Sequence, residues 1–150
     1  MASLADTIDE LVAANRILAN EGVVDAYGHI SARHPDRPDR FLLSCSRSPE
    51  LVSAADIMEF TLEGEAVDPQ GRRPYLERFI HGGILEARPD VVAVVHAHAE
   101  DILPFGLTDG TPLRPVIHSG SFIGANSYQT FLNASAFPQY PSMAPSAGLA

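Results

Sequence analysis

Hydrophobic residues recur at helical spacing near the start of the chain and again in its middle. Between residues 4 and 21 they fall at intervals of three, four and seven, which predicts an amphipathic helix with one buried stripe. Ser3 and Asp6 resemble a capping box at the start of that helix. A second helix is predicted over residues 74–87, because apolar positions again repeat at helical spacing and Pro89 follows the last of them.

Shorter apolar runs predict strands between and after these helices. Residues 27–33 alternate in part and open one strand, and residues 41–43 form a short apolar run typical of a buried strand. Residues 57–62 and 65–67 suggest a hairpin. Residues 91–95 are a continuous apolar run rich in β-branched side chains, which predicts a central strand buried on both faces. Strands and helices mix throughout, so we expect a layered α/β fold.

The end of the chain differs in composition from the rest. Residues 126–150 show no hydrophobic period and contain no Asp, Glu, Lys or Arg. Such a composition favours irregular structure over a packed core. We therefore expect one domain over residues 1–125 and a separate, irregular tail over residues 126–150.

The charge and the single cysteine narrow the possible partners and the compartment. The chain of 150 residues has 10 Lys and Arg against 19 Asp and Glu, a formal net charge of −9. Nucleic acids and anionic membrane surfaces are bound mainly through Lys and Arg, so neither is expected as a partner. There is no signal-peptide pattern and no apolar run near the ~20 residues of a membrane span. Cys45 cannot form an internal disulfide, so we expect a cytoplasmic protein.

Two histidines, His96 and His98, directly follow the apolar run of residues 91–95. Residues i and i+2 of a strand share a face, so the two imidazoles are predicted to project together, as ligands of Zn²⁺ or Mn²⁺ do. A pair of surface histidines at a strand end is the alternative. On the second predicted helix, Glu77 and His81 are four residues apart and share a face. Glu77 is then a candidate ligand or general acid/base, or else a solvated charge beside neighbouring arginines, and His81 a packed or supporting histidine.

The order and spacing of these residues resemble the class II aldolase/adducin family. The resemblance rests on residues 28–31, 41–44, 77–81, 88–91 and 94–98, and extends over roughly residues 4–125. It implies a three-layer α/β/α class II aldolase-like fold with a mainly antiparallel central sheet, and a homotetrameric enzyme that uses a divalent metal. The residues it assigns are Glu77 as catalytic acid/base and His96 and His98 as metal ligands.

At the positions where sugar-phosphate aldolases of this family hold the phosphate, this chain has other residues. His29 stands for the family's asparagine, Arg47 follows Ser46 in place of a glycine, and Tyr75-Leu76 replaces a pair of serines. Leu76 cannot donate a hydrogen bond, which argues against a phosphate pocket. Arg47 instead offers a carboxylate a planar, bidentate partner, with a solvated loop arginine as the alternative.

Four stretches, at residues 24–29, 33–35, 74–82 and 116–121, are similar to the family's decarboxylases of hydroxylated aromatic or pyridine carboxylic acids, such as 3-hydroxy-2-methylpyridine-4,5-dicarboxylate decarboxylase. This similarity implies a metal-dependent lyase whose substrate is a small carboxylate. The expected substrate-binding residues are Arg47, His29, Ser46, Tyr75 and His118. A sugar-phosphate aldolase or epimerase, and a non-catalytic adducin-like interaction module, remain as alternatives.

The family takes a third metal histidine from a later strand, which in this numbering lies beyond residue 150. We therefore expect a truncated or frame-shifted chain in which the fold is incomplete at the C-terminus. A metal held by two histidines, with or without Glu77, should be bound weakly. Stability and activity of the chain are accordingly expected to be impaired.

Overall fold

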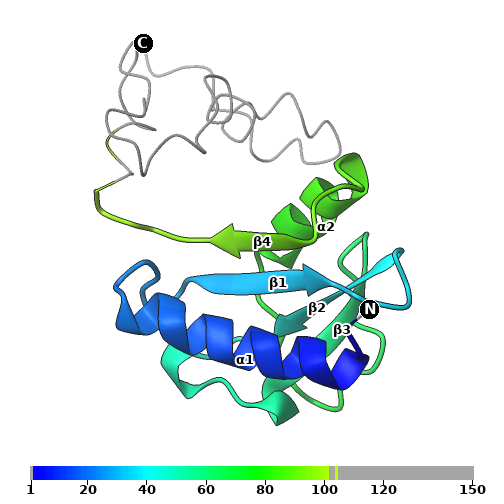
Figure 1. Cartoon of the computed structure of the whole chain (residues 1–150), viewed down its shortest axis with the longest axis horizontal. Helices are drawn as coiled ribbons and strands as arrows, with labels where there is room; N and C mark the ends of the chain where they lie inside the picture. The colour runs from blue at the N-terminus through cyan, green and yellow to red at the C-terminus, as the bar shows by residue number, and fades with distance from the viewer. Residues whose placement is uncertain (1, 102–103, 105–150) are drawn as a thin grey trace. The chain divides into compact units, whose positions relative to one another are not determined.

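The computed structural model describes residues 2–101 and 104 (Figure 1). The chain divides into two units, residues 1–99 and 100–150, and almost all of the described part belongs to the first. No described helix is long and apolar enough to cross a membrane. The predicted domain boundary at residue 125, the tail and His118 lie outside the described residues. The elements of the first unit, besides two short 3₁₀ turns, are α1 (Leu4–Asn20), β1 (His29–Arg33), β2 (Arg40–Ser44), β3 (Ile57–Thr61), α2 (Arg78–Ala87) and β4 (Ala93–His96).

The first helix, α1, forms as its pattern predicts. Ser3 Oγ accepts the backbone N–H of Asp6 at 3.1 Å and the Asp6 carboxylate accepts the N–H of Ser3 at 3.0 Å, which confirms the capping box. The helix packs through its apolar stripe, as amphipathic helices do. The residues that meet in this layer are Leu4, Ile8, Leu11, Val12, Ile30, Ala32, Leu42, Val52 and Ile57.

The sheet separates two helical layers. Its strands run in the order β3-β2-β1-β4 and every neighbouring pair is antiparallel. Alternate residues of a strand face opposite sides. Ile30 and Ala32 of β1 pack against the α1 side, while His29 and Ser31 face α2 and meet His81 there. Figure 1 shows α1 and α2 on either side of the sheet, so the predicted three layers and antiparallel sheet are confirmed.

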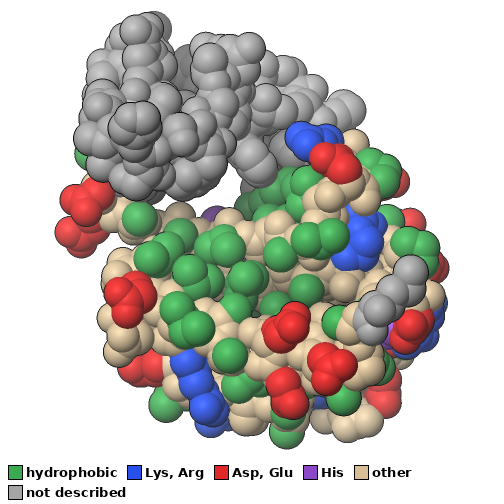
Figure 2. Space-filling view, in the orientation of Figure 1, with side chains coloured by type: hydrophobic (Ala, Val, Ile, Leu, Met, Phe, Trp, Pro, Cys, Tyr) green, Lys and Arg blue, Asp and Glu red, His purple; other side chains and the backbone are tan. Residues whose placement is uncertain are grey.

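The last strand, β4, differs from its prediction. Among the described residues it pairs only with β1 and therefore lies at one end of the sheet. Val94 is buried, but Val92 and Val95 are 69% and 45% exposed. Figure 2 shows hydrophobic side chains gathered over β1 and β4, whereas acidic ones lie along α1. The expectation of a central strand buried on both faces is wrong for the described sheet, because an apolar run does not reveal how many neighbours a strand has.

Two other elements differ in extent from their predictions. The second arm of the predicted hairpin forms only an isolated bridge between Phe60 and Ala66. Helix α2 begins at Arg78 rather than at residue 74, because the preceding segment is tied to the end of β2 by a bridge between Cys45 and Pro74. The N-cap position, just before the first helical residue, is therefore occupied by Glu77.

Candidate active site

A pocket of about 480 Å³ opens beside the N-terminus of α2, and its volume lies in the range of small-molecule sites. It is built from the segment before β1, the loop after β2 and the segment that leads into α2. Four of the predicted site residues meet here although they come from two distant parts of the sequence. The main lining residues are Tyr27, Ser46, Arg47, Tyr75, Leu76 and Glu77.

Tyr75 fixes the loop that forms one wall of this pocket. Its hydroxyl accepts the backbone N–H of Arg47 at 3.2 Å and donates to the backbone carbonyl of the same residue. The ring is buried and lies 4.1 Å, centroid to centroid, from the ring of His29. Burial is the main cause that raises the pKa of the Tyr75 phenol, so it remains a protonated donor. The hydroxyl is therefore occupied by the loop backbone.

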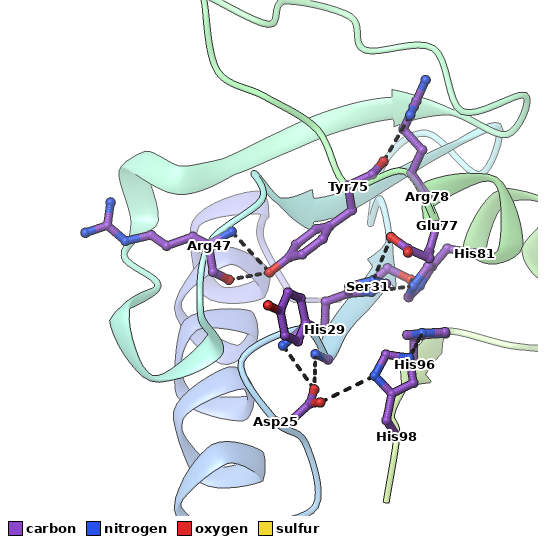
Figure 3. Close-up of polar contacts among 12 residues, drawn as sticks. Asp25, His29, Ser31, Arg47, Tyr75, Glu77, Arg78, His81, His96 and His98 are labelled. Atoms are coloured by element: carbon purple, nitrogen blue, oxygen red, sulfur yellow. Dashed lines mark hydrogen bonds and ion pairs between the residues drawn. The ribbon is translucent and has the colours of Figure 1, made fainter. Parts of the chain in front are cut away.

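Arg47 lines the pocket, but its guanidinium already has a carboxylate partner. Its Nη1 lies 3.3 Å from Oδ1 of Asp56, and Figure 3 shows the side chain extending away from Glu77. Burial raises the pKa of Asp56, but hydrogen bonds from Ser53 and the charge of Arg47 outweigh it, so the pKa is lowered. The carboxylate of Asp56 is thus ionised beside the guanidinium. The role of Arg47 as a substrate partner stays a prediction.

Three buried groups, Ser31, His81 and His29, join β1 to α2 behind the pocket. His81 Nδ1 lies 2.7 Å from Ser31 Oγ, and His81 Nε2 lies 2.8 Å from His29 Nδ1. Desolvation lowers the pKa of His29 to about 2, with help from the neighbouring histidines, and that of His81 to about 3. Both rings are therefore neutral. Glu77 Oε2 lies 4.0 Å from His29 Nε2, a contact between a neutral ring and a carboxylate rather than an ion pair.

The predicted metal ligands, His96 and His98, come together at the end of β4. The sheet places His96 directly opposite His29, and these two rings stack at 4.9 Å with an interplanar angle of 15°. Nε2 of His96 lies 2.9 Å from Nε2 of His98, with the two rings nearly perpendicular. Burial, and then the proximity of His98, lowers the pKa of His96, which keeps the ring in the neutral form that binds metals.

Asp25 supports this pair and was not identified as a site residue from the sequence. Its Oδ2 lies 3.5 Å from His98 Nδ1, and its Oδ1 accepts the backbone N–H groups of Tyr27 at 3.0 Å and Gly28 at 2.9 Å. Burial raises the pKa of Asp25, but these hydrogen bonds and His98 outweigh it and lower the pKa. The sequence signal that could have identified Asp25 is an aspartate three residues before a glycine. This pattern is typical of a turn in which the aspartate side chain accepts hydrogen bonds from the following backbone N–H groups.

Gly28 allows this turn to lie against β4. A Cβ built at residue 28 would fall 2.5 Å from Cβ of Val24 and 3.1 Å from the carbonyl oxygen of His96. Any larger residue would therefore push the start of β1 away from the strand that carries the histidine pair.

The histidine pair fits part of a metal centre. Metal–nitrogen bonds of 2.0–2.1 Å at the tetrahedral angle place two imidazole nitrogens about 3.3–3.4 Å apart, so the 2.9 Å between His96 and His98 would widen by about 0.4 Å around an ion. Asp25 would hold the far nitrogen of His98, as carboxylates do behind metal-bound histidines. Within the part of the chain that the structure describes, however, no three His, Cys, Asp or Glu side chains converge as a complete ligand set. Glu77 lies with the pocket and His29 rather than as a third ligand.

Comparison with known proteins shows which family this chain belongs to. A family model described as the class II aldolase and adducin N-terminal domain matches residues 9–145. This chain belongs to the class II aldolase and adducin family. The match extends past residue 125, while the predicted end of the domain there stays a prediction.

Relatives within the class II aldolase family include decarboxylases. The chain is 43% identical over 112 residues to decarboxylase tropJ of Talaromyces stipitatus, covering 73% of this chain and 42% of that protein. It is 32% identical over 143 residues to 3,4-dihydroxyphthalate decarboxylase of Arthrobacter keyseri, covering 89% and 54%. The structure matches L-fuculose 1-phosphate aldolase from Glaciozyma antarctica with a TM-score of 0.62 and 29% identity, over 71% of this chain and 47% of that one. The chain thus spans about half the length of these relatives.

Proposed function

We propose that this chain carries the metal-binding and proton-transfer residues of a divalent-metal-dependent carbon–carbon lyase, and that its reaction is the decarboxylation of a hydroxylated aromatic carboxylic acid. The supporting observation is the convergence of the His96 and His98 imidazoles on β4, which β1 connects to a pocket lined by Glu77. Similarity to two decarboxylases supports the choice of reaction. Assembly as a homotetramer is part of the proposal, and further metal ligands would come from outside the described residues.

The residues have separate tasks in this proposal. His96 and His98 would hold the cation, Mn²⁺ or Zn²⁺, which supplies Lewis-acid stabilisation of negative charge on substrate oxygens. When the carbon–carbon bond breaks, carbon dioxide leaves and the electron pair remains on the ring carbon. The carboxylate of Glu77 takes up a proton from water and delivers it to that carbon, and the hydroxide that remains combines with carbon dioxide as bicarbonate. Ser46 and the backbone of the loop held by Tyr75 would orient the substrate. Arg47 would contribute by pairing its guanidinium with a substrate carboxylate as well as with Asp56.

A phosphorylated sugar is the second candidate substrate, because the chain also resembles L-fuculose 1-phosphate aldolase. The local geometry argues against it. The hydroxyl of Tyr75 and the N–H of Arg47 are bonded to each other, and the side chain of Leu76, which is 80% exposed at the pocket, has no donor. The side-chain donors left at this wall are those of Ser46, Ser48 and Arg47, and the guanidinium of Arg47 is paired with Asp56. The exposed Leu76 and Tyr27 instead offer apolar surface that suits an aromatic ring.

The deciding experiment measures carbon dioxide release from 3,4-dihydroxyphthalate in the presence of Mn²⁺ or Zn²⁺, beside cleavage of L-fuculose 1-phosphate. We expect release from the aromatic acid only, and its loss in Glu77→Gln with metal content unchanged. Glu86→Gln, on the exposed side of α2, is the matched control and should keep the wild-type rate. Full activity in Glu77→Gln, or preferential cleavage of the phosphorylated sugar, would show the proposal to be wrong.

A further inference from the structure

The line of buried groups behind the pocket ends at the proposed acid/base. Ser31 Oγ, His81 and His29 are joined by contacts of 2.7 and 2.8 Å, and all three residues are fully buried. The last atom of the line, Nε2 of His29, is a buried polar atom without a hydrogen-bond partner in the described part of the chain. It lies 4.0 Å from Oε2 of Glu77, and Figure 3 shows the four side chains grouped together. The proposed reaction gives Ser31 and His81 no task.

The contacts within the line allow only two ordered arrangements of protons. A neutral imidazole carries one N–H and one lone pair, so each of these rings must donate at one nitrogen and accept at the other. Two ring nitrogens 2.8 Å apart share a single proton. Either every donor points from Ser31 toward Glu77, which leaves an N–H on Nε2 of His29, or every donor points the opposite way and leaves a lone pair there.

The carboxylate of Glu77 distinguishes these two arrangements. An ionised carboxylate accepts hydrogen bonds and donates none. A lone pair of His29 aimed at it would be repelled, whereas an N–H would be attracted, and both effects are stronger away from solvent. The arrangement in which Ser31 donates to His81, His81 to His29, and His29 toward Glu77 is therefore the favoured one.

We propose that Ser31 and His81 are positioning residues, which hold His29 in the tautomer with its proton on Nε2 so that this N–H orients the carboxylate of Glu77. A small rotation of the Glu77 side chain, which is 43% exposed, would close the 4.0 Å gap to a hydrogen bond. The importance of this orientation for turnover rests on the proposed function, but the proton arrangement itself does not.

Nitrogen-15 NMR of the histidine-labelled full chain, without metal or substrate, reads the tautomers directly, because long-range correlations identify the protonated ring nitrogen. Single histidine variants assign the signals. We expect the proton on Nε2 in both His29 and His81. A proton on Nδ1 of His29, or fast averaging between the two forms, would overturn the proposal. The first of these outcomes would leave Nε2 of His29 free to accept a proton or bind a metal instead.

Two matched pairs of variants test the ends of the line. Ser31→Thr and Ser31→Val add the same bulk, but only threonine keeps the hydroxyl that donates to Nδ1 of His81, so the nitrogen-15 signal of that Nδ1 should stay that of a hydrogen-bonded lone pair in the first and shift to that of an unpaired one in the second. Glu77→Gln should release the preference of His29, whereas Glu86→Gln should not. An unchanged His29 tautomer in Glu77→Gln would overturn the coupling to Glu77, whether or not the chain is an enzyme.

Turnover adds an independent readout. If the line orients Glu77, Ser31→Val should lower kcat by about tenfold or more relative to Ser31→Thr, with KM unchanged, because substrate contacts are not altered. Equal kcat values in the two variants would overturn the positioning role. The absence of turnover in wild type would instead count against the proposed function, since the tautomer measurement does not depend on catalysis.

Discussion

Two pairs of histidines in this protein make nearly the same contact in opposite surroundings. The rings of His29 and His81 meet at 2.8 Å between β1 and α2, with both side chains fully buried. The rings of His96 and His98 meet at 2.9 Å at the end of β4, where the side chain of His98 is 42% exposed. Neighbours fix the protons of the buried pair, whereas the open pair leaves two nitrogens accessible to an exchangeable ion. Burial and partners, rather than residue type, separate the proposed positioning role of the first pair from the proposed ligand role of the second.

The largest expected effect comes from breaking the buried pair. His81→Leu leaves Ser31 Oγ and Nδ1 of His29 without their partner, and unpaired buried groups cost ~1–3 kcal/mol each. We expect the free energy of unfolding to fall by about 2–4 kcal/mol in urea denaturation. His98→Ala, in the open pair, should change it by less than about 0.5 kcal/mol. Similar losses in the two variants would contradict the contrast between the pairs.

Metal binding should show the reverse ranking. His98→Ala removes one of two converging ligands and is expected to weaken Zn²⁺ binding by about 100-fold or more, measured by titration calorimetry. His34→Asn, which removes a histidine near the other end of β1, is the control, because asparagine can still accept the N–H groups of Asp36 and Arg37. Equal Zn²⁺ affinity in His98→Ala and wild type would refute the assigned ligand.

The buried pair also predicts how stability depends on pH. The pKa of His81 is about 3 in the folded chain against 6.5 for an unperturbed histidine, so between these values the unfolded chain binds a proton that the folded chain does not. The free energy of unfolding should therefore fall as pH drops below 6.5, by up to about 1.4 kcal/mol per unit for this residue. Denaturation at pH 4.5–6.5 should give a shallower slope in His81→Gln. An unchanged slope would mean that His81 is already protonated in the fold.

The smallest expected effect concerns the residue behind the open pair. Asp25→Asn keeps an oxygen that can accept the N–H groups of Tyr27 and Gly28 but removes the negative charge beside His98. Supporting carboxylates of this kind alter metal affinity by about 10–100-fold, and the partial exposure of Asp25 favours the lower end. Zn²⁺ titration should therefore show about tenfold weaker binding. An unaltered Zn²⁺ affinity would indicate that Asp25 stabilises only the turn that contains Tyr27 and Gly28.

Most of the fold could be predicted from local patterns, and the exceptions have a common cause. The capping box, helix α1 and the buried run in β2 followed from spacing alone, because neighbours along the chain determine them. The start of α2 could not be predicted, since the bridge between Cys45 and Pro74 holds the preceding segment extended. The place of β4 in the sheet also depends on pairing with a strand about sixty residues earlier.

The candidate site divides in the same way. The two-residue spacing of His96 and His98 predicted that their rings would converge, because strand geometry is local. The contact of His98 with Asp25 and that of His81 with His29 join distant segments, and the sequence gives no distance between them. For Arg47, the sequence indicated a side chain suited to binding a carboxylate. It did not indicate that Asp56 of the same chain would be the partner.

The sequence by itself determined the family, the types of most elements and the residues capable of metal and proton chemistry, because these follow from side-chain identity and short-range spacing. The tertiary structure decided which histidines are buried and which remain open, and which carboxylate lies beside each pair. Those properties arise from the register of β1 with β4 and from α2 packing over the opposite face of the sheet to α1. Desolvation and long-range hydrogen bonds then give chemically identical imidazoles different protonation properties and roles.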